Sequence, residues 1–156
     1  MESATVQQKP ILVAVDGSDE SAGALAWAVG RATGSGEALR IVTCYEQPYP
    51  ATDVAGDYWR ELMVAKRAAR TRAESTVVDV LGQAEDVDHV VRLGSVDRVL
   101  VEMSPEASLI VVGHRAPRPW WSRLRGTLAA RIKESAACPV ASIPVGETPV
   151  DEPIAA

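Results

Sequence analysis

The feature that most constrains the fold is a run of four aliphatic residues, Leu109 to Val112, that ends at Gly113. A strand in which every residue is apolar has to be covered on both faces, which is typical of parallel sheets packed between two layers of helices. Ile11 to Val15 is a second short run of this kind, and Asp16-Gly17-Ser18 ends it with turn residues. Both segments are therefore predicted to be buried strands.

Strand-like and helix-like segments alternate five times along the chain. Strands are predicted at 11–15, 39–45, 87–93, 107–113 and 138–143. The segments between them carry apolar residues at helical spacing, and the longest helix is expected from about Tyr58 to Val80. The third strand carries Asp88 and Arg92 and is expected near a sheet edge. This order predicts an α/β domain with a parallel sheet, right-handed crossovers and helices on both faces.

Composition narrows the classes of protein. A chain of 156 residues with a net charge of −5 favours one globular domain and argues against a protein that coats nucleic acid. No nucleic acid partner is therefore expected. No apolar run reaches the roughly 18 to 20 residues that span a bilayer, so no membrane partner is expected either, and a cytoplasmic location is predicted. Cys44 and Cys138 are isolated, which predicts reduced thiols and no metal site. The domain is expected over residues 9–145, with flexible ends at 1–8 and 146–156.

Ligands of such folds bind outside the carboxyl ends of the strands, and two segments there have the ingredients of a phosphate cradle. Gly113 would let the chain turn sharply and let a ligand approach the backbone. Gly126-Thr127 would open a helix, where free N–H groups attract anions and the hydroxyl can donate to phosphate or cap the helix. Four arginines add positive charge: Arg115, Arg118, Arg123 and Arg125. The alternative is an ordinary strand end, helix start and solvated loop.

Other candidate residues also allow two interpretations. Asp16 could accept hydrogen bonds from ribose hydroxyls, or serve as the cap of the following helix. Val42 to Tyr45 could form a wall for an adenine ring, or simply a core strand. His89 and His114 have no Ser, Cys or Asp at a spacing that suggests catalysis, so neither is expected to be catalytic. Trp120-Trp121 could contact a partner or pack under the loop.

Three segments together resemble the universal stress protein family. They are Val-Ala-Val-Asp-Gly-Ser-x-x-Ser-x-x-Ala-Leu from Val13, Leu-Ile-Val-Val-Gly from Leu109 and Cys-Pro-Val-Ala-Ser-Ile-Pro from Cys138. The resemblance implies a Rossmann-like fold of the adenine nucleotide alpha hydrolase type, with an open five-stranded sheet in the order 3-2-1-4-5. It also implies binding of ATP, or of another adenine nucleotide such as AMP, with Mg²⁺. A homodimer through the fifth strand is implied as well, at Val140, Ala141, Ser142 and Ile143.

The resemblance also implies a set of nucleotide-binding positions. Asp16 would contact the ribose and Val42 the adenine, and the whole set is Ala14, Val15, Asp16, Val42, Gly113, Arg115, Ala116, Gly126, Thr127 and Leu128. Two residues depart from the family pattern: Ala116 replaces a glycine, and Ala129 replaces a hydroxyl residue. A methyl group where positive φ is needed costs about 1 kcal/mol, and a lost hydrogen bond costs about as much. Binding would then be weaker by about one to two decades.

The predicted function is that of a dimeric stress-response regulator that binds an adenine nucleotide and acts on a regulatory protein partner that the sequence does not identify. No general base or metal cluster is visible in the sequence, so turnover is expected to be slow or absent. One alternative is a nucleotide-free dimeric interaction module of the same family. Another is a true ATP hydrolase.

Overall fold

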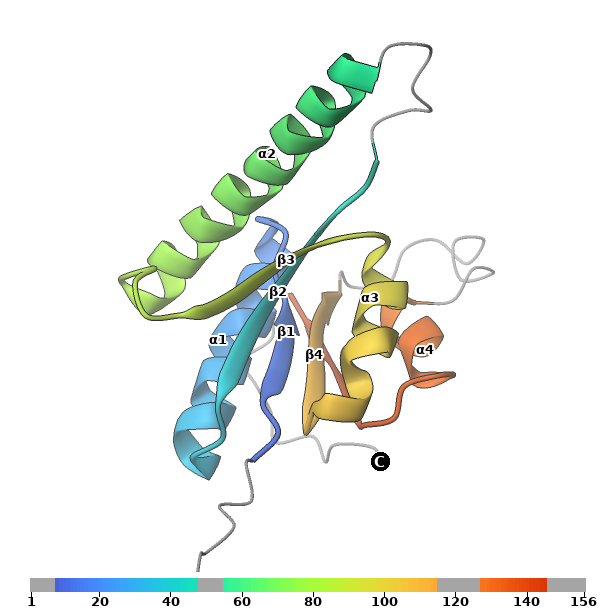
Figure 1. Cartoon of the computed structure of the whole chain (residues 1–156). Helices are drawn as coiled ribbons and strands as arrows, with labels where there is room; N and C mark the ends of the chain where they lie inside the picture. The colour runs from blue at the N-terminus through green and yellow to red at the C-terminus, as the bar shows by residue number, and fades with distance from the viewer. Residues whose placement is uncertain (1–7, 48–54, 115–126, 146–156) are drawn as a thin grey trace, which may run out of the picture.

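Five parallel strands form one sheet in the order β3-β2-β1-β4-β5 (Figure 1). The structure is a computed structural model and describes residues 8–47, 55–114 and 127–145. The strands are β1 (Ile11–Ala14), β2 (Leu39–Tyr45), β3 (Asp88–Leu93), β4 (Leu109–His114) and β5 (Val140–Pro144). The predicted α/β class and strand order are confirmed, and so is the position of the third strand at an edge of the sheet.

The central strand β1 pairs with β2 on one side and with β4 on the other, so Ile11 lies opposite both Leu39 and Leu109. Side chains of a strand alternate between the two faces of a sheet. Ile11 and Val13 accordingly enter one core cluster, and Leu12 enters the other. The four aliphatic residues of β4 are all buried, as their sequence predicts.

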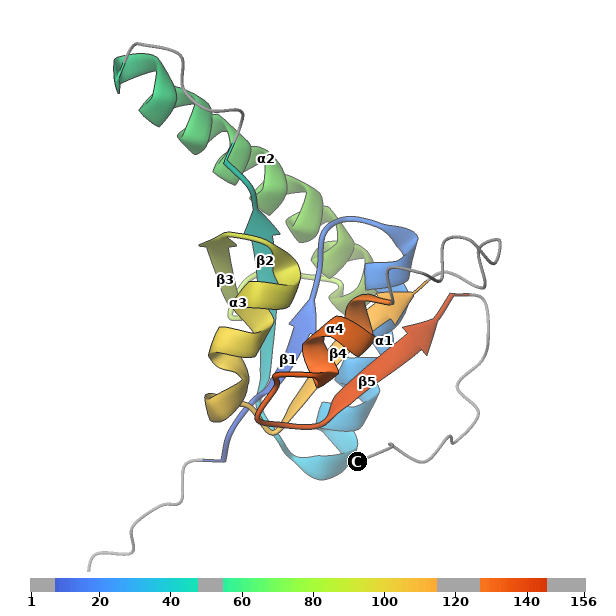
Figure 2. The same cartoon turned by 90° about the vertical axis from the view of Figure 1, so that its right-hand side faces the viewer.

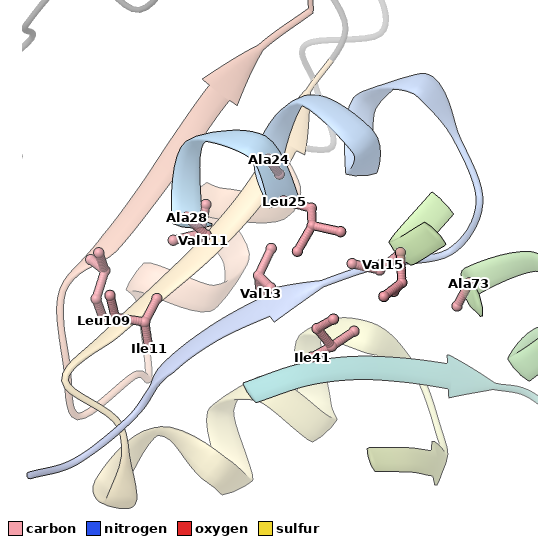
Figure 3. Packing of buried hydrophobic residues seen from close by; sticks show 11 residues of the cluster. Ile11, Val13, Val15, Ala24, Leu25, Ala28, Ile41, Ala73, Leu109 and Val111 are labelled. Carbon is pink, nitrogen blue, oxygen red and sulfur yellow. The ribbon is translucent and has the colours of Figure 1, made fainter. Parts of the chain in front are cut away.

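Helices cover both faces of the sheet (Figures 1 and 2). Figure 3 shows the cluster beneath α1 (Asp19–Ser35) and α2 (Ala55–Leu81), where Leu25 and Ala73 of the helices meet Ile41 of β2. The second cluster lies beneath α3 (Val96–Met103) and α4 (Leu128–Lys133) and includes Leu100 and Ile132. Each face of the sheet is thus closed by two helices.

The helix boundaries follow local chemistry. The Ser18 side chain accepts a hydrogen bond from the amide of Ser21 and caps α1, which ends at Gly36. The helix α2 is the longest, as predicted, and its amino-terminal half projects beyond the carboxyl end of the sheet (Figures 1 and 2). The helix α3 ends at Met103, and Ser104-Pro105 begins a separate 3-10 turn, η1 (Ser104–Glu106), whose first turn accepts proline.

Candidate functional site

Asp16 lies two residues after the end of β1 and is exposed at the carboxyl edge of the sheet. Its Oδ1 accepts hydrogen bonds from the amide of Ser18 at 2.9 Å and from the Ser18 hydroxyl at 2.5 Å. The amide of Asp16 donates to the hydroxyl of Ser21. Gly17 between them has a φ of 92°, and a Cβ there would lie 2.9 Å from the Cβ of Arg72, so the turn requires glycine. The local sequence therefore holds the carboxylate in one orientation.

The same hydrogen bonds set the charge of this carboxylate. Burial alone would raise the pKa of Asp16, but the hydrogen bonds from Ser18 and Ser21 outweigh burial and hold the pKa below its ordinary value. Asp16 is therefore ionised at neutral pH and only accepts hydrogen bonds. Both bonds from Ser18 end on Oδ1, so Oδ2 keeps its capacity to accept from a ligand.

Gly113 has a different role from the predicted one. The strand β4 continues through Gly113 to His114, and Gly113 lies opposite Ile143 of β5, so the sharp turn expected at this glycine is wrong. A Cβ at Gly113 would lie 2.0 Å from the carbonyl oxygen of Glu20. The glycine is thus required because the first turn of α1 packs directly against the end of β4.

Thr127 caps α4, as one of its two interpretations predicted. Its Oγ1 accepts a hydrogen bond from the amide of Ala130 at 3.1 Å. Because that bond uses only a lone pair, the hydroxyl proton remains available to a ligand. Leu128 is half-buried against the second core cluster and Ala129 is buried in it. A hydroxyl residue at position 129 would point into this core, so Ala129 removes less from the site than the sequence suggested.

The remaining predicted residues divide into buried, half-buried and undescribed ones. Val15 and Val42 are buried in opposite core clusters, and the carbonyl of Val42 accepts from the amide of Val15 at 3.0 Å. Both side chains therefore belong to the core rather than to the surface of the sheet edge, while Ala14 is half-buried beside Val42. The predictions for Arg115, Ala116 and Gly126, and for Arg118, Arg123, Arg125 and Trp120-Trp121, lie outside the described residues, as do the expected flexible ends except Gln8.

Both histidines have hydroxyl partners that the sequence analysis missed. His114 Nδ1 lies 2.8 Å from the Ser142 hydroxyl across β4 and β5, and His89 Nε2 lies 2.8 Å from the Thr43 hydroxyl across β3 and β2. Thr43 also donates to the carbonyl of Val15 at 2.8 Å. Parallel register creates these pairs, and sequence spacing does not reveal them. Burial, with Arg70 nearby, lowers the pKa of His89.

A cavity of about 260 Å³ lies beside the Gly17-Ser18 turn, between α1 and α2. Ser18, Asp19, Arg72 and Asp79 line it. The part of the chain that the structure describes contains no group of three or more His, Cys, Asp or Glu side chains that could hold a metal ion. Both cysteines are half-buried, and burial raises the pKa of Cys44 to about 11, which keeps it a neutral thiol.

An open parallel sheet with two helices on each face, and an oriented carboxylate at the end of its central strand, defines a doubly wound α/β domain. In this class the ligand crevice lies where the strand order reverses, here between β1 and β4. The profile of the universal stress protein family matches residues 8–144. The chain belongs to the universal stress protein family.

The chain is similar in sequence to curated family members and in fold to solved ones. Universal stress protein Rv2624c of Mycobacterium tuberculosis is 34% identical over 145 residues, which cover 93% of this chain and 50% of that protein. The chain thus spans about half the length of the curated relatives it matches. A universal stress protein solved in complex with cAMP has a TM-score of 0.59 and 24% identity, over 90% of this chain and 99% of that one. An Arabidopsis thaliana family member with AMP bound has a TM-score of 0.56 and 19% identity, over 92% of this chain and 97% of that one.

None of the helices within 8–47, 55–114 and 127–145 combines the length and the apolar character needed to cross a membrane.

The ion pairs of Asp16 are a separate matter: none of the ion pairs within those ranges involves this carboxylate. The charge of the carboxylate is therefore balanced only by hydrogen bonds from this part of the chain.

Proposed function

We propose that this chain binds an adenine nucleotide, ATP or a related one such as AMP, at the carboxyl edge of the sheet and acts as a homodimeric stress-response regulator. The observation that carries the proposal is Asp16, an ionised carboxylate held by Ser18 at the point where the strand order reverses. An acid at this position is suited to ribose hydroxyls. Solved family members that contain cAMP and AMP support the choice of an adenine nucleotide.

Each described residue has a defined task in this proposal. Asp16 Oδ2 accepts from the ribose, and the Thr127 hydroxyl, whose oxygen already caps α4, donates its proton to a phosphate oxygen. Val15 and Val42 support this edge of the sheet from the core, and Leu128 packs against the second core cluster. The resemblance to the family pattern assigns three further residues to the phosphate site: Arg115, Ala116 and Gly126. Mg²⁺ commonly binds through substrate phosphates, so in this proposal it would enter the site with the nucleotide.

Calorimetric titration of nucleotide-stripped protein with ATP and with AMP, each with and without Mg²⁺, tests the proposal. Asp16→Asn removes charge-assisted hydrogen bonds worth about 1.5 to 3 kcal/mol, so we expect roughly ten- to hundredfold weaker binding. Asp86→Asn is the matched control, because Asp86 is exposed and has a φ of 62°, which asparagine adopts readily. Absence of heat with both nucleotides would favour the nucleotide-free interaction module. Equal affinity of wild type and Asp16→Asn would remove the carboxylate from the ribose site.

The dimer is proposed to form through β5, which is an edge strand and therefore has one side open to pairing. Val140 is buried, while Ala141, Ser142 and Ile143 are half-buried. Light scattering at micromolar concentration should give twice the chain mass of 16.6 kDa. A mass of one chain would exclude this assembly.

A further inference from the structure

The projecting half of α2 exposes two large apolar side chains. Trp59 is 63% exposed and Met63 is 59% exposed, although both belong to a helix whose other face packs on the sheet. The ring of Tyr58 supports Trp59 edge-on, with ring centroids 5.5 Å apart. This half of α2 extends past the carboxyl end of the sheet (Figures 1 and 2), and there Leu62 is buried whereas Trp59 and Met63 are exposed.

Charge is segregated around this part of the helix. A helix has about 3.6 residues per turn, so four basic residues fall on the same side as Trp59 and Met63. We call this side the Trp59 face; it consists of Trp59, Arg60, Met63, Lys66, Arg67 and Arg70. Arg70 pairs with Glu74, whereas Arg60, Lys66 and Arg67 form no ion pair within the described ranges. Asp57 and Glu61 fall on the opposite side, beside Val64.

We propose that the Trp59 face binds the surface of an anionic lipid membrane. An apolar anchor flanked by lysine and arginine is the pattern of helices that lie in the headgroup region. Trp59 and Met63 would enter the acyl boundary. The long stems of Lys66 and Arg67 can remain in the apolar layer while their charged ends reach lipid phosphates. The expectation of no membrane partner rested on the lack of a spanning segment, and a helix that lies on a surface needs none.

The pattern fits other occupants less well. A helix that docks into a protein groove presents apolar anchors at the first, fourth or fifth, and eighth positions. Counted from Trp59, the eighth position is Lys66, so the face offers only two anchors. A second copy of the chain in a two-fold dimer would bring the same patch against itself. The arginines of this face in one copy would then oppose the arginines of the other copy without acidic partners.

Sedimentation of the full chain with vesicles tests the proposal, using phosphatidylcholine alone or mixed with phosphatidylglycerol. We expect binding only to the anionic vesicles, and less binding as salt is raised. Trp59→Ala should weaken binding about tenfold through lost apolar burial. Arg67→Ala should weaken it about fivefold.

Two matched variants separate this face from general effects. Val78→Ala removes a side chain that is 45% exposed but lies in the carboxyl-terminal half of α2, which packs on the sheet. Arg98→Ala removes an exposed arginine of α3. Both should bind like wild type, and thermal melting should show that all four variants fold. Equal binding to neutral vesicles, no binding at low salt, or equal losses in Val78→Ala and Trp59→Ala would overturn the proposal. Conversion of a dimer to a monomer by Trp59→Ala would overturn it in favour of a second copy.

Discussion

Replacing Thr43 by valine tests how the strands beneath the site are held together. Thr43 is buried in β2, and its hydroxyl donates to the carbonyl of Val15 and contacts His89 Nε2, both at 2.8 Å. Because the hydroxyl has one proton and gives it to the carbonyl, His89 must donate a proton from Nε2. Valine has nearly the same shape, so Thr43→Val removes both hydrogen bonds without creating a cavity.

The expected loss follows from these two bonds. Each contributes about 0.5 to 1.5 kcal/mol, so the free energy of unfolding should fall by about 2 kcal/mol. For a chain of this size that lowers the Tm by about 4 to 8 °C. Urea unfolding followed by circular dichroism measures the loss, and the midpoint should move while the slope stays constant.

The control is Thr76→Val in α2. Thr76 is also buried, but its hydroxyl has no hydrogen-bond partner within the described ranges. Its replacement should change the free energy of unfolding by less than about 0.5 kcal/mol. If the two variants lose equal stability, or if Thr43→Val loses none, the link between the three strands contributes nothing and the reasoning is wrong.

Two further predictions concern pH and packing. The pKa of His89 is lowered in the folded state by burial and by Arg70, so the unfolded state takes up its proton first as pH falls. The stability that His89 contributes is therefore full above its unfolded pKa of about 6.5 and is lost as the pH falls below it. Urea unfolding should show this fall in the free energy of unfolding between about pH 7 and pH 5. His89→Gln should make the free energy of unfolding depend less on pH over that range. Gly113→Ala would place a Cβ 2.0 Å from the Glu20 carbonyl and should cost more than about 2 kcal/mol in the same assay. Gly34→Ala, with no atom within 4 Å of the new Cβ, should be neutral or stabilising, and equal effects of the two would contradict the packing argument.

Much of the fold could be predicted because its signals are local. The aliphatic run of β4, the turn residues after β1 and the charged residues of β3 each carry their own physical reason. The 3-10 turn η1 was not predicted, because the sequence after α3 has no signal that distinguishes such a turn from a loop.

The local geometry of the candidate site could be predicted only where one residue acts alone. Asp16 and Thr127 have caps and turns that adjacent sequence specifies. Contacts between distant segments could not be read from spacing, because they depend on strand register and helix placement. The approach of Glu20 to Gly113 and the pairing of Ser142 with His114 are of this kind.

The central position of β1 has a consequence for biosynthesis. Ile11 can pair with Leu39 soon after both leave the ribosome, but its other partner, Leu109, is made much later. Contacts between segments so far apart in sequence slow folding, because a long loop must close first. The edge at which β1 meets β4 is therefore not formed in a partly made chain. A ligand that bound there, as proposed, would stabilise only the completed domain, and its occupancy would report how much of this domain in the cell is fully assembled.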